Sequence, residues 1–402
     1  MSQPAAAHRV CLVIGTRPEA IKMAPVIAAL RAVPCLEPVV VATTQHREML
    51  RQALDVFGIV PDIDLELMQN GQDLSVFTAR ALTALTDTFL TLKPDFVLVQ
   101  GDTSTVTAAA LAAFYQGIPM GHVEAGLRSF DLSSPFPEEV NRRIATCTAT
   151  IHFAPTEEAR TNLLAEGIPD SDIVVTGNTV VDALQMVQPR DFFATPALND
   201  ILWGKRRVLL TTVHRRESLG EALESICDAL ETLVARYDDV DIVFPVHLNP
   251  RVRDVVRRRL AGHARIHLLE PIPYPDLLEV MRRAHLVLSD SGGIQEEVCS
   301  FRKPILILRD CTERPEVVHA GFGELVGTDS ATIVARTATL LSDQNLYNIR
   351  TSGANPFGDG RASVHIAASI DNFFQRPART HGPQRLKMAP LADMVAQLSL
   401  AS

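Results

Sequence analysis

Three acidic side chains that could move protons stand close behind apolar stretches in the first half of the chain. Asp102 follows the apolar run 95–99, Glu124 follows directly after Val123, and Glu138 lies a short loop further on. Carboxylates held near one another have their pKa values pushed apart, so that one can act as an acid and another as a base. Each could instead serve only the fold, Asp102 as a helix cap and Glu138 at a helix start. As a set they predict a site for proton transfer.

Cationic side chains that could hold an anion stand at two further strand ends. Arg17 and Lys22 follow the apolar run 10–14, at the start of a predicted helix, and His214 follows the apolar run 208–213. The N-terminus of a helix adds N–H donors and the positive end of a dipole to such cations. A histidine can also transfer a proton near neutral pH. These positions therefore favour phosphate binding over a merely solvated basic loop.

A pair of glycines marks a third candidate, in the second half of the chain. Ser291, Gly292 and Gly293 follow an apolar run and open a predicted helix, in which Glu297 comes one turn later. Without Cβ atoms, the backbone N–H groups can approach a pyrophosphate closely, and a carboxylate can accept hydrogen bonds from ribose hydroxyls. Most glycine pairs only make turns. It is the combination with Glu297 and with Arg314, which could contact phosphate in a bidentate manner, that predicts a nucleotide-sugar site.

The elements that must position these residues alternate between short apolar strands and helical patterns, which predicts an α/β fold with doubly wound parallel sheets. The alternation pauses over residues 188–203. We therefore predict a Rossmann-like N-terminal domain over 1–188 and a Rossmann-like nucleotide-binding domain over 204–355. A helix within 356–374 would pack back on the first domain, and 375–402 would form a tail without an assigned role. Ligands of such sheets bind beyond the carboxyl ends of the strands, so the cleft between the domains is the predicted site.

Composition excludes several classes of protein. A length of 402 residues favours two domains, and a net charge of −9 with only 5% aromatic residues argues against a nucleic-acid partner. No uninterrupted apolar stretch of about 18 residues predicts a membrane span, and residues 1–9 lack a signal-peptide core. The six cysteines are dispersed and form no C-x-x-C pair. We therefore predict a cytoplasmic protein with reduced thiols and no metal site.

Taken jointly, the motifs closely resemble those of the bacterial non-hydrolysing UDP-N-acetylglucosamine 2-epimerases. The resemblance extends from about residue 10 to about residue 374, and it is carried by residues 15–19 (Gly-Thr-Arg-Pro-Glu), 43–49, 101–103, 122–128, 137–139, 214–217, 290–293 and 313–316.

This resemblance implies a glycosyltransferase-B-like fold with two Rossmann-type domains that close over the ligand. It implies reversible C2 epimerisation of UDP-N-acetylglucosamine to UDP-N-acetylmannosamine by elimination and re-addition of UDP, in a homodimer, with a UDP-sugar as partner and no cofactor. The catalytic residues it implies are Asp102, Glu124, Glu138 and His214. The substrate-binding residues it implies are Arg17, Lys22, Arg142, His214, Ser291, Gly292, Gly293, Glu297 and Arg314.

The chain departs from the family pattern at two places. Ile272 and Leu277 stand where the family often carries Gln and Phe near the uracil, so uracil contacts would rest on backbone groups. Several members bind a second substrate molecule as an activator, for which Gln45, Arg215 and His247 are the candidates. Glu48 and Gly71, however, replace a Gln and an Arg found in some members.

Four alternatives stay open. They are a 2-epimerase of a modified UDP-sugar such as a diacetamido-uronic acid, a hydrolysing 2-epimerase, a glycosyltransferase of the same fold, and a non-catalytic nucleotide-sugar-binding module. The intact motif at residues 15–19 argues against hydrolysis. The clustered carboxylates favour chemistry at C2 over simple transfer or binding.

Overall fold

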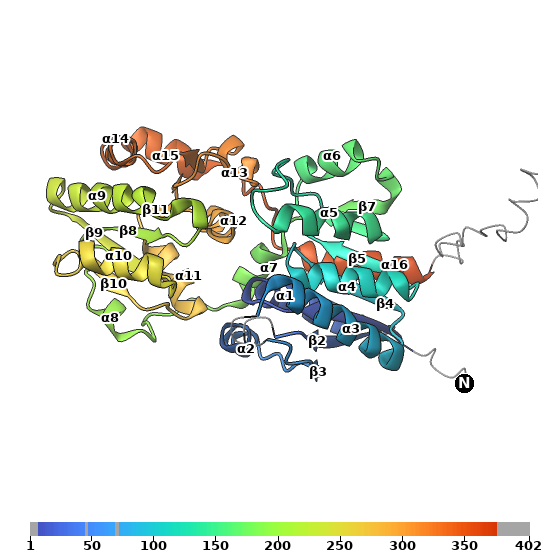
Figure 1. The fold of residues 1–402 in the computed structure, drawn as a ribbon. Helices are drawn as coiled ribbons and strands as arrows, with labels where there is room; N and C mark the ends of the chain where they lie inside the picture. The colour runs from blue at the N-terminus through green and yellow to red at the C-terminus, as the bar shows by residue number, and fades with distance from the viewer. Residues whose placement is uncertain (1–6, 45–46, 69–71, 376–402) are drawn as a thin grey trace, which may run out of the picture.

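The computed structural model describes residues 7–44, 47–68 and 72–375, which form two α/β lobes side by side (Figure 1). The N-terminal lobe contains β1 (His8–Ile14), α1 (Arg17–Arg31), β2 (Leu36–Ala42), α2 (Arg47–Val56), β3 (Ile63–Asp64), α3 (Leu74–Leu92), β4 (Phe96–Gln100), α4 (Ser104–Tyr115), β5 (Met120–Val123), α5 (Glu138–Thr148), β6 (Ile151–Ala154), α6 (Glu157–Ala165), β7 (Ile173–Val175) and α7 (Thr179–Met186).

The C-terminal lobe contains α8 (Pro196–Asn199), β8 (Arg207–Thr212), α9 (Glu221–Arg236), β9 (Val240–Pro245), α10 (Pro250–Leu260), β10 (Ile266–Leu269), α11 (Tyr274–Arg283), β11 (Leu286–Ser289), α12 (Gly292–Ser300), β12 (Ile305–Ile307), α13 (Pro315–His319), β13 (Gly323–Leu325), α14 (Ser330–Ser342) and α15 (Gln344–Ser352). The last described helix, α16 (Ala362–Gln375), returns to the N-terminal lobe.

Each lobe is built on one parallel sheet whose strands are apolar because helices cover both faces. The strand order is β3-β2-β1-β4-β5-β6-β7 in the first sheet and β10-β9-β8-β11-β12-β13 in the second. The residues from Val10 to Ile14 on β1 are fully buried, as expected of a central parallel strand. The α/β class and the two doubly wound sheets predicted from the sequence are confirmed.

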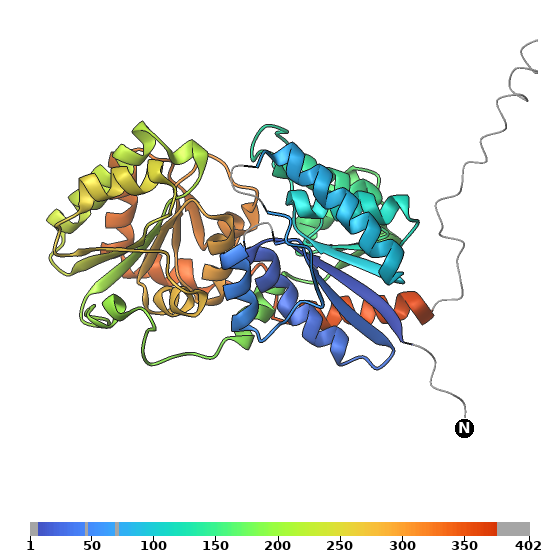
Figure 2. The ribbon, with the colours of Figure 1, turned by 60° about the horizontal axis from the view of Figure 1, so that its bottom comes forward.

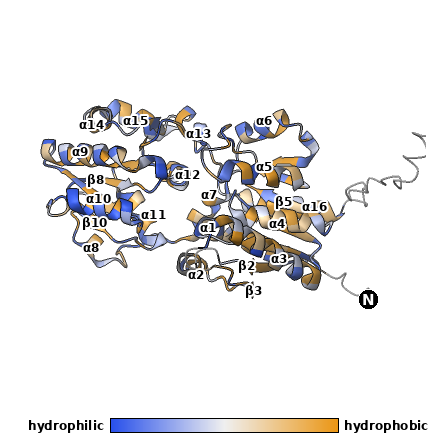
Figure 3. Ribbon diagram, viewed as in Figure 1, coloured by the Kyte–Doolittle hydropathy of each residue, from blue (hydrophilic) through white to orange (hydrophobic). Residues whose placement is uncertain are grey.

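The helices differ in how much water they meet, as their sequences require. Figure 3 shows mostly apolar residues in α4 and mostly hydrophilic residues in α10. Helix α4 packs between α3 and α5 over the first sheet, and a run of small residues lets these helices approach closely. Helix α10 carries five arginines and buries only Val252, Val256 and Leu260.

The strand order reverses at the same place in both sheets. In the first sheet β1 lies between β2 and β4, and in the second β8 lies between β9 and β11. The loops after these central strands therefore diverge and leave a crevice at the carboxyl edge of each sheet, where doubly wound folds bind ligands. The motifs predicted to carry chemistry follow β1, β4, β5, β8 and β11, at these edges of the two sheets.

Helix α16 connects the end of the chain to the first lobe. It runs beside α1, as Figure 2 shows, and it also contacts α7. Its N-terminus is fixed by Asp182, whose carboxylate accepts hydrogen bonds from Ser363 N at 2.8 Å and Ser363 Oγ at 2.6 Å. Phe373 packs edge-on against Phe96 with 5.3 Å between ring centroids. Apart from Gln375, the predicted tail 375–402 lies outside the described residues.

The sequence pattern does not reveal five of the elements found. Strand β3 has two residues, α8 and α13 have four and five, and α15 buries no residue, so none shows an apolar period. Helix α7 has eight residues and ends where the predicted pause begins. Within that pause, α8 is a single turn that begins at Pro196, and the Trp203 indole donates to the Leu198 carbonyl at 2.7 Å.

Candidate active site

Asp102 stands in the loop after β4 and is held by a cation from α5. Arg142 donates from Nε to Asp102 Oδ2 at 3.1 Å, and Asn141 donates to the Asp102 carbonyl at 2.9 Å. The capping role considered for Asp102 belongs instead to Thr103, whose hydroxyl accepts from Val106 N at 3.3 Å. The Asp102 carboxylate therefore takes no part in capping the helix, and 23% of the Asp102 side chain is exposed.

Glu124 follows β5 and occupies an unfavourable backbone conformation. Its φ is +66°, a region that side chains with a Cβ rarely adopt and that concentrates at functional sites. Lys22 donates to its carboxylate from α1, and Asn178 donates to the same oxygen at 3.0 Å. Burial and the nearby charge of Glu296 raise the pKa of Glu124, although Lys22 opposes this. A carboxyl group whose pKa is raised in this way is a better base than an ordinary glutamate.

Glu138 is the first residue of α5, and the next residue, Glu139, makes the contacts that hold this end of the helix. Burial and the charge of Asp102 raise the pKa of Glu138, whose Oε2 is buried with no hydrogen-bond partner among the described residues. Glu139 instead pairs with Arg142 at 3.1 Å and accepts from Ser129 N at 3.0 Å. Glu138 is thus left available, close enough to Asp102 for their charges to interact.

In the C-terminal lobe, His214 follows β8 and is oriented by Asp290. Its Nδ1 lies 3.0 Å from Asp290 Oδ1, and the backbone N–H groups of His214 and Arg215 donate to Asp290 at 3.0 and 2.9 Å. Burial would raise the pKa of Asp290, but these hydrogen bonds and the His214 ring hold it below its ordinary value. A carboxylate that fixes one ring nitrogen leaves the other free for a ligand. The ring is 39% exposed, so Nε2 can be reached.

The glycine turn after β11 brings a guanidinium group against the start of α12. A Cβ on Gly292 would lie 2.5 Å from Arg314 Nη1, so only glycine admits Arg314 at this place. Arg314 is buried and pairs with Glu313 at 2.7 Å. Next to it, Gly293 faces open space. Ser291 precedes the helix as its N-cap residue, so free N–H groups and a guanidinium converge here, as an anion requires.

Glu297 lies behind this turn and meets a cation from the other lobe. The Tyr274 hydroxyl donates to Glu297 at 2.9 Å, and the Arg17 guanidinium lies over the Tyr274 ring at 5.7 Å from its centroid. Burial raises the pKa of Glu297 to about 7, although the hydrogen bond and Arg17 oppose this. Burial likewise lowers the pKa of Arg17. Arg17 and Glu297 therefore close one side of the crevice from opposite lobes.

The two lobes are joined at their centre by buried ion pairs. Lys22 on α1 lies 2.7 Å from Glu296 on α12, and Arg314 donates to Glu296 at 2.6 Å. Arg314 also lies 3.9 Å from Glu124. The predicted Lys22, Glu124 and Arg314 are thus brought together across the crevice by a carboxylate that the sequence analysis did not single out.

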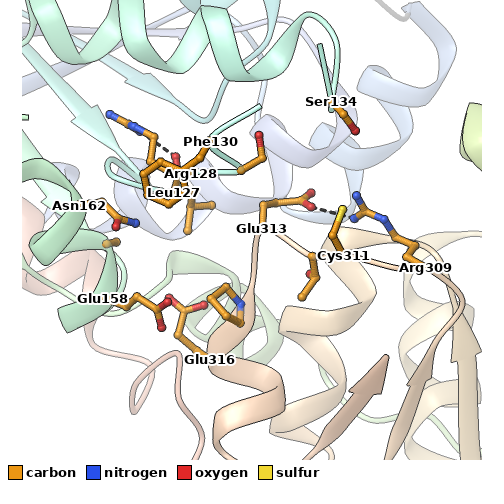
Figure 4. Close-up of a pocket in the computed structure, with 14 residues that line it drawn as sticks. Leu127, Arg128, Phe130, Ser134, Glu158, Asn162, Arg309, Cys311, Glu313 and Glu316 are labelled. Carbon is orange, nitrogen blue, oxygen red and sulfur yellow. Dashed lines mark hydrogen bonds and ion pairs between the residues drawn. The ribbon is translucent and has the colours of Figure 1, made fainter. Parts of the chain in front are cut away.

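A pocket of about 210 Å³ lies between the lobes next to these groups (Figure 4). Phe130 and Ser134 line it from the N-terminal lobe, and Arg309, Cys311 and Glu313 line it from the other. Glu313 accepts from Arg309 at 2.8 Å, and the same carboxylate pairs with Arg314 and Arg215. The pocket therefore adjoins Arg314 through Glu313, but none of the catalytic or substrate-binding residues predicted from the sequence lines it.

The candidates for a second, regulatory site are placed only in part. Gln45 and Gly71 lie outside the described residues. Arg215 forms an ion pair with Glu313 at 2.9 Å, and the centroid of the His247 ring lies 5.9 Å from that of the His214 ring. Burial lowers the pKa of His247, so near neutral pH this ring acts as an uncharged hydrogen-bonding group.

Sequence reasoning missed three buried polar residues that support the site. Glu19 accepts from Gly15 N, from Thr16 N at 3.0 Å and from the Thr103 hydroxyl, and so ties the loop after β1 to the loop after β4. Asn178 and Glu296 bind Glu124 and Lys22 as described above. The only signal was their place in or beside motifs, since their partners lie far away in sequence. Across the described parts of the chain, no group of three or more His, Cys, Asp or Glu is arranged to hold a metal ion.

Comparison with known proteins finds relatives over most of this chain. A family model described as UDP-N-acetylglucosamine 2-epimerase matches residues 28–371. A Salmonella typhimurium protein named UDP-N-acetylglucosamine 2-epimerase is 49% identical over 371 residues, which cover 91% of this chain and 99% of the relative. The crystal structure of a UDP-GlcNAc 2-epimerase from Neisseria meningitidis bound to UDP-GlcNAc has a TM-score of 0.87 and 44% identity, with 92% of this chain and 100% of that chain covered. A glycotransferase of kitacinnamycin, 12% identical with a TM-score of 0.63, shares the fold alone. None of the helices in the described ranges is both long enough and apolar enough to span a membrane.

Proposed function

Because the chain belongs to the UDP-N-acetylglucosamine 2-epimerase family, we propose that it interconverts UDP-N-acetylglucosamine and UDP-N-acetylmannosamine by eliminating and re-adding UDP. One observation carries the proposal beyond the family match. The Glu124 carboxylate lies next to Lys22 and Arg314, and these two cations also border the crevice between the lobes. A group suited to take a proton and groups suited to hold a departing diphosphate therefore lie in one network.

In the elimination step, a carboxylate removes the proton from C2 while the bond between C1 and the phosphate oxygen breaks. The electrons of the C2–H bond form a C1–C2 double bond, and those of the broken C–O bond leave with UDP. Return of a proton to the opposite face of C2 and attack of UDP on C1 complete the epimerisation. The oxidation state of the sugar is unchanged overall, so the reaction calls for no redox cofactor.

Two opposed proton-transfer groups suit the carboxylates of the N-terminal lobe. Glu124 forms one group, and the pair Asp102 and Glu138 forms the other, with Arg142 orienting Asp102. The raised pKa values of Glu124 and Glu138 make both carboxyl groups better bases than ordinary glutamates. We assign C2 chemistry to these three residues.

The departing UDP would be held mainly by the C-terminal lobe. The N–H groups after Ser291, the guanidinium of Arg314 and the ring of His214 would stabilise the charge that develops on the diphosphate. Glu297 would accept hydrogen bonds from the ribose hydroxyls. Arg17 and Lys22 reach the same ligand from the other lobe, so approach of the lobes would complete the site and keep water from the unsaturated intermediate.

The test is proton exchange at C2. The protein is incubated with UDP-N-acetylglucosamine in D2O, and proton NMR follows the signals of C1 and C2. We expect deuterium to enter C2 while UDP stays attached to the sugar at equilibrium. Free N-acetylmannosamine would indicate a hydrolysing 2-epimerase. Exchange confined to a diacetamido-uronic acid analogue would indicate a modified substrate, and the absence of exchange with either would contradict the epimerase assignment.

The homodimer and the cytoplasmic location remain predictions. A homodimer is supported by exposed apolar side chains at neighbouring ends of α3 and α4, where Leu90, Phe114 and Tyr115 are about half exposed or more. Light scattering on the purified protein would measure the mass, and Tyr115→Lys should shift it toward that of a monomer. Activation by a second substrate molecule would show as sigmoidal kinetics that Arg215→Gln flattens.

A further inference from the structure

Glu296 on α12 is a fully buried carboxylate that contacts one cation from each lobe. Its Oε2 lies 2.7 Å from Lys22 Nζ, and its Oε1 accepts a 2.6 Å hydrogen bond from Arg314 Nε. Its side chain is 0% exposed, so water and salt do not screen either contact. None of the roles proposed above uses this residue.

We propose that Glu296 is a positioning residue that sets the directions of Lys22 and Arg314 toward the diphosphate, an inference that rests on the proposed function. Both cations end long, flexible side chains, which lose rotamer freedom when they are fixed. A carboxylate fixed in a helix between them holds both before the ligand arrives. The charge that develops on the leaving diphosphate then meets donors already in place.

The donor edges of Arg314 show how this positioning works. Its Nε is taken by Glu296 and its Nη1 by Glu313 at 2.7 Å, while Gly292 leaves room for the guanidinium plane. Its Nη2 lies 3.9 Å from Glu124 Oε1. Two edges are therefore fixed by carboxylates, and the third faces the crevice, where a phosphate oxygen can accept from it.

Glu296 also keeps Lys22 and Arg314 from both pairing with Glu124 alone. The groups that face Glu124 are Lys22 from α1, Asn178 before α7, Glu296 from α12 and Arg314 before α13. With Glu296 present, two carboxylates balance two cations. Without it, Glu124 would hold both cations by itself, which would stabilise its ionised form and weaken it as a base.

A positioning role and a merely structural role predict different effects of Glu296→Gln. Loss of the negative charge removes a group that repels the diphosphate, and this gain offsets part of the affinity lost when the cations are misdirected, so the Kd of UDP should change much less than kcat. Misdirected cations should nevertheless lower kcat by about tenfold or more. The acid limb of the kcat profile should move to lower pH, because Glu124 loses a like-charged neighbour. A merely structural residue would weaken UDP binding and kcat together and leave the profile in place.

The matched control is Glu279→Gln. Glu279 is another buried carboxylate that pairs with two cations, Arg282 and Arg283, but it does so on α11 away from the crevice. We expect this variant to keep wild-type kcat, KM and pH profile. Glu296→Asp keeps the charge and, being shorter by one methylene, can reach one cation only, so its kcat should fall between those of the wild type and Glu296→Gln.

The measurements are kcat and KM from C2 exchange, the Kd of UDP by calorimetry, and the thermal midpoint. A Glu296→Gln variant with kcat within twofold of wild type contradicts the inference, as does one whose UDP affinity falls by the same factor as kcat. Should Glu296→Gln fail to fold, Glu296→Asp decides, because a wild-type kcat there also contradicts it. Wild-type exchange is measured first. Its absence would contradict the proposed function, whereas exchange that Glu296 variants leave unchanged contradicts this inference alone.

Discussion

Asp102 and Asp290 occupy equivalent places in the two lobes, but they differ in burial and in the groups that hold them. Each follows the strand next to the central one on the same side of the reversal, β4 in the first sheet and β11 in the second. Asp290 is fully buried and accepts from His214 N, Arg215 N and the Ser218 hydroxyl. Asp102 is partly exposed, and Arg142 is the cation that holds it. Topology places a carboxylate at both edges, but the donors around it decide whether it is a fixed support or a group free to react.

The same contrast runs through the loops around them. The first lobe pairs Asp102 with Arg142 and Glu124 with Lys22, and so keeps several charged groups close to the crevice. The second lobe uses Gly292 to admit Arg314 and a helix N-terminus to face the ligand. On the proposed function, the first lobe would supply the proton-transfer groups and the second most of the phosphate contacts. This contrast can be tested by measuring whether C2 proton exchange and UDP binding are lost separately in different variants.

The largest separation should come from Asp102→Asn. The amide keeps an oxygen for Arg142 but cannot take a proton, so C2 exchange should fall by about 10²- to 10⁴-fold. UDP affinity should stay within about threefold, because the variant leaves every residue proposed to contact the diphosphate unchanged. Exchange is followed by NMR and binding by calorimetry. Asp95→Asn, at the opposite end of β4, is the control and should change neither. Equal loss of exchange and of UDP affinity would mean that the lobes do not divide the work.

The converse experiment uses the glycine turn. A Cβ at residue 292 would strike the Arg314 guanidinium, so Gly292→Ala should displace it and remove a charge-assisted hydrogen bond to the ligand. Such a bond is worth about 1.5–3 kcal/mol, which corresponds to a UDP Kd raised by roughly 10- to 100-fold. Calorimetry measures the affinity of the variant for UDP.

Gly293→Ala sharpens this result. A Cβ at residue 293 would come no closer than 4.0 Å to its nearest protein neighbour, Ser291 Oγ. Any loss of UDP affinity there reports contact with the ligand itself. Should both variants bind UDP as the wild type does, the turn is not the phosphate site.

Much of this arrangement could be predicted from the sequence. Apolar runs of five or six residues mark the central strands, and a reactive residue directly after a strand must lie at the carboxyl edge of its sheet. That reasoning places Asp102, Glu124 and His214 at the crevice, where the structure has them. Burial patterns are local in sequence, so they can be seen without knowing the tertiary fold.

The supporting residues could not be found this way, because their partners are remote. Glu19 meets Thr103, 84 positions away, and Lys22 meets Glu124, 102 positions away. The capping role considered for Asp102 was likewise wrong, because α4 begins at Ser104 and Thr103 is its N-cap residue. The backbone direction after Gly101 decides for Thr103, and a sequence does not show that direction.

A smaller effect should appear in how binding depends on pH. Burial raises the pKa of Glu297 to about 7. Below that pH the protonated carboxyl accepts ribose hydroxyls poorly, so affinity is present above pH 7 and is lost as the pH falls. Between pH 8 and pH 6 the Kd of UDP-N-acetylglucosamine should rise about tenfold, as expected for one required ionisation. The diphosphate of this ligand carries no group that titrates in the range. Asp102→Asn allows the measurement without turnover, and adding Glu297→Gln should make the Kd independent of pH.

The smallest effect should come from Tyr274→Phe, which tests where the lobes touch. The variant keeps the ring beneath Arg17 but removes the hydroxyl that donates to Glu297 at 2.9 Å. That hydrogen bond stabilises the ionised carboxylate, so its loss should raise the pKa of Glu297 further, by about one unit. The midpoint of the affinity profile would then move to higher pH, and at pH 8 the Kd would rise only about twofold. Tyr347→Phe is the matched control, because its hydroxyl donates to the His285 carbonyl at the far end of β11. An unshifted midpoint in Tyr274→Phe would show that Glu297 does not govern the pH dependence of binding, and that the C-terminal lobe holds the nucleotide through its glycine turn and arginine without a titrating partner.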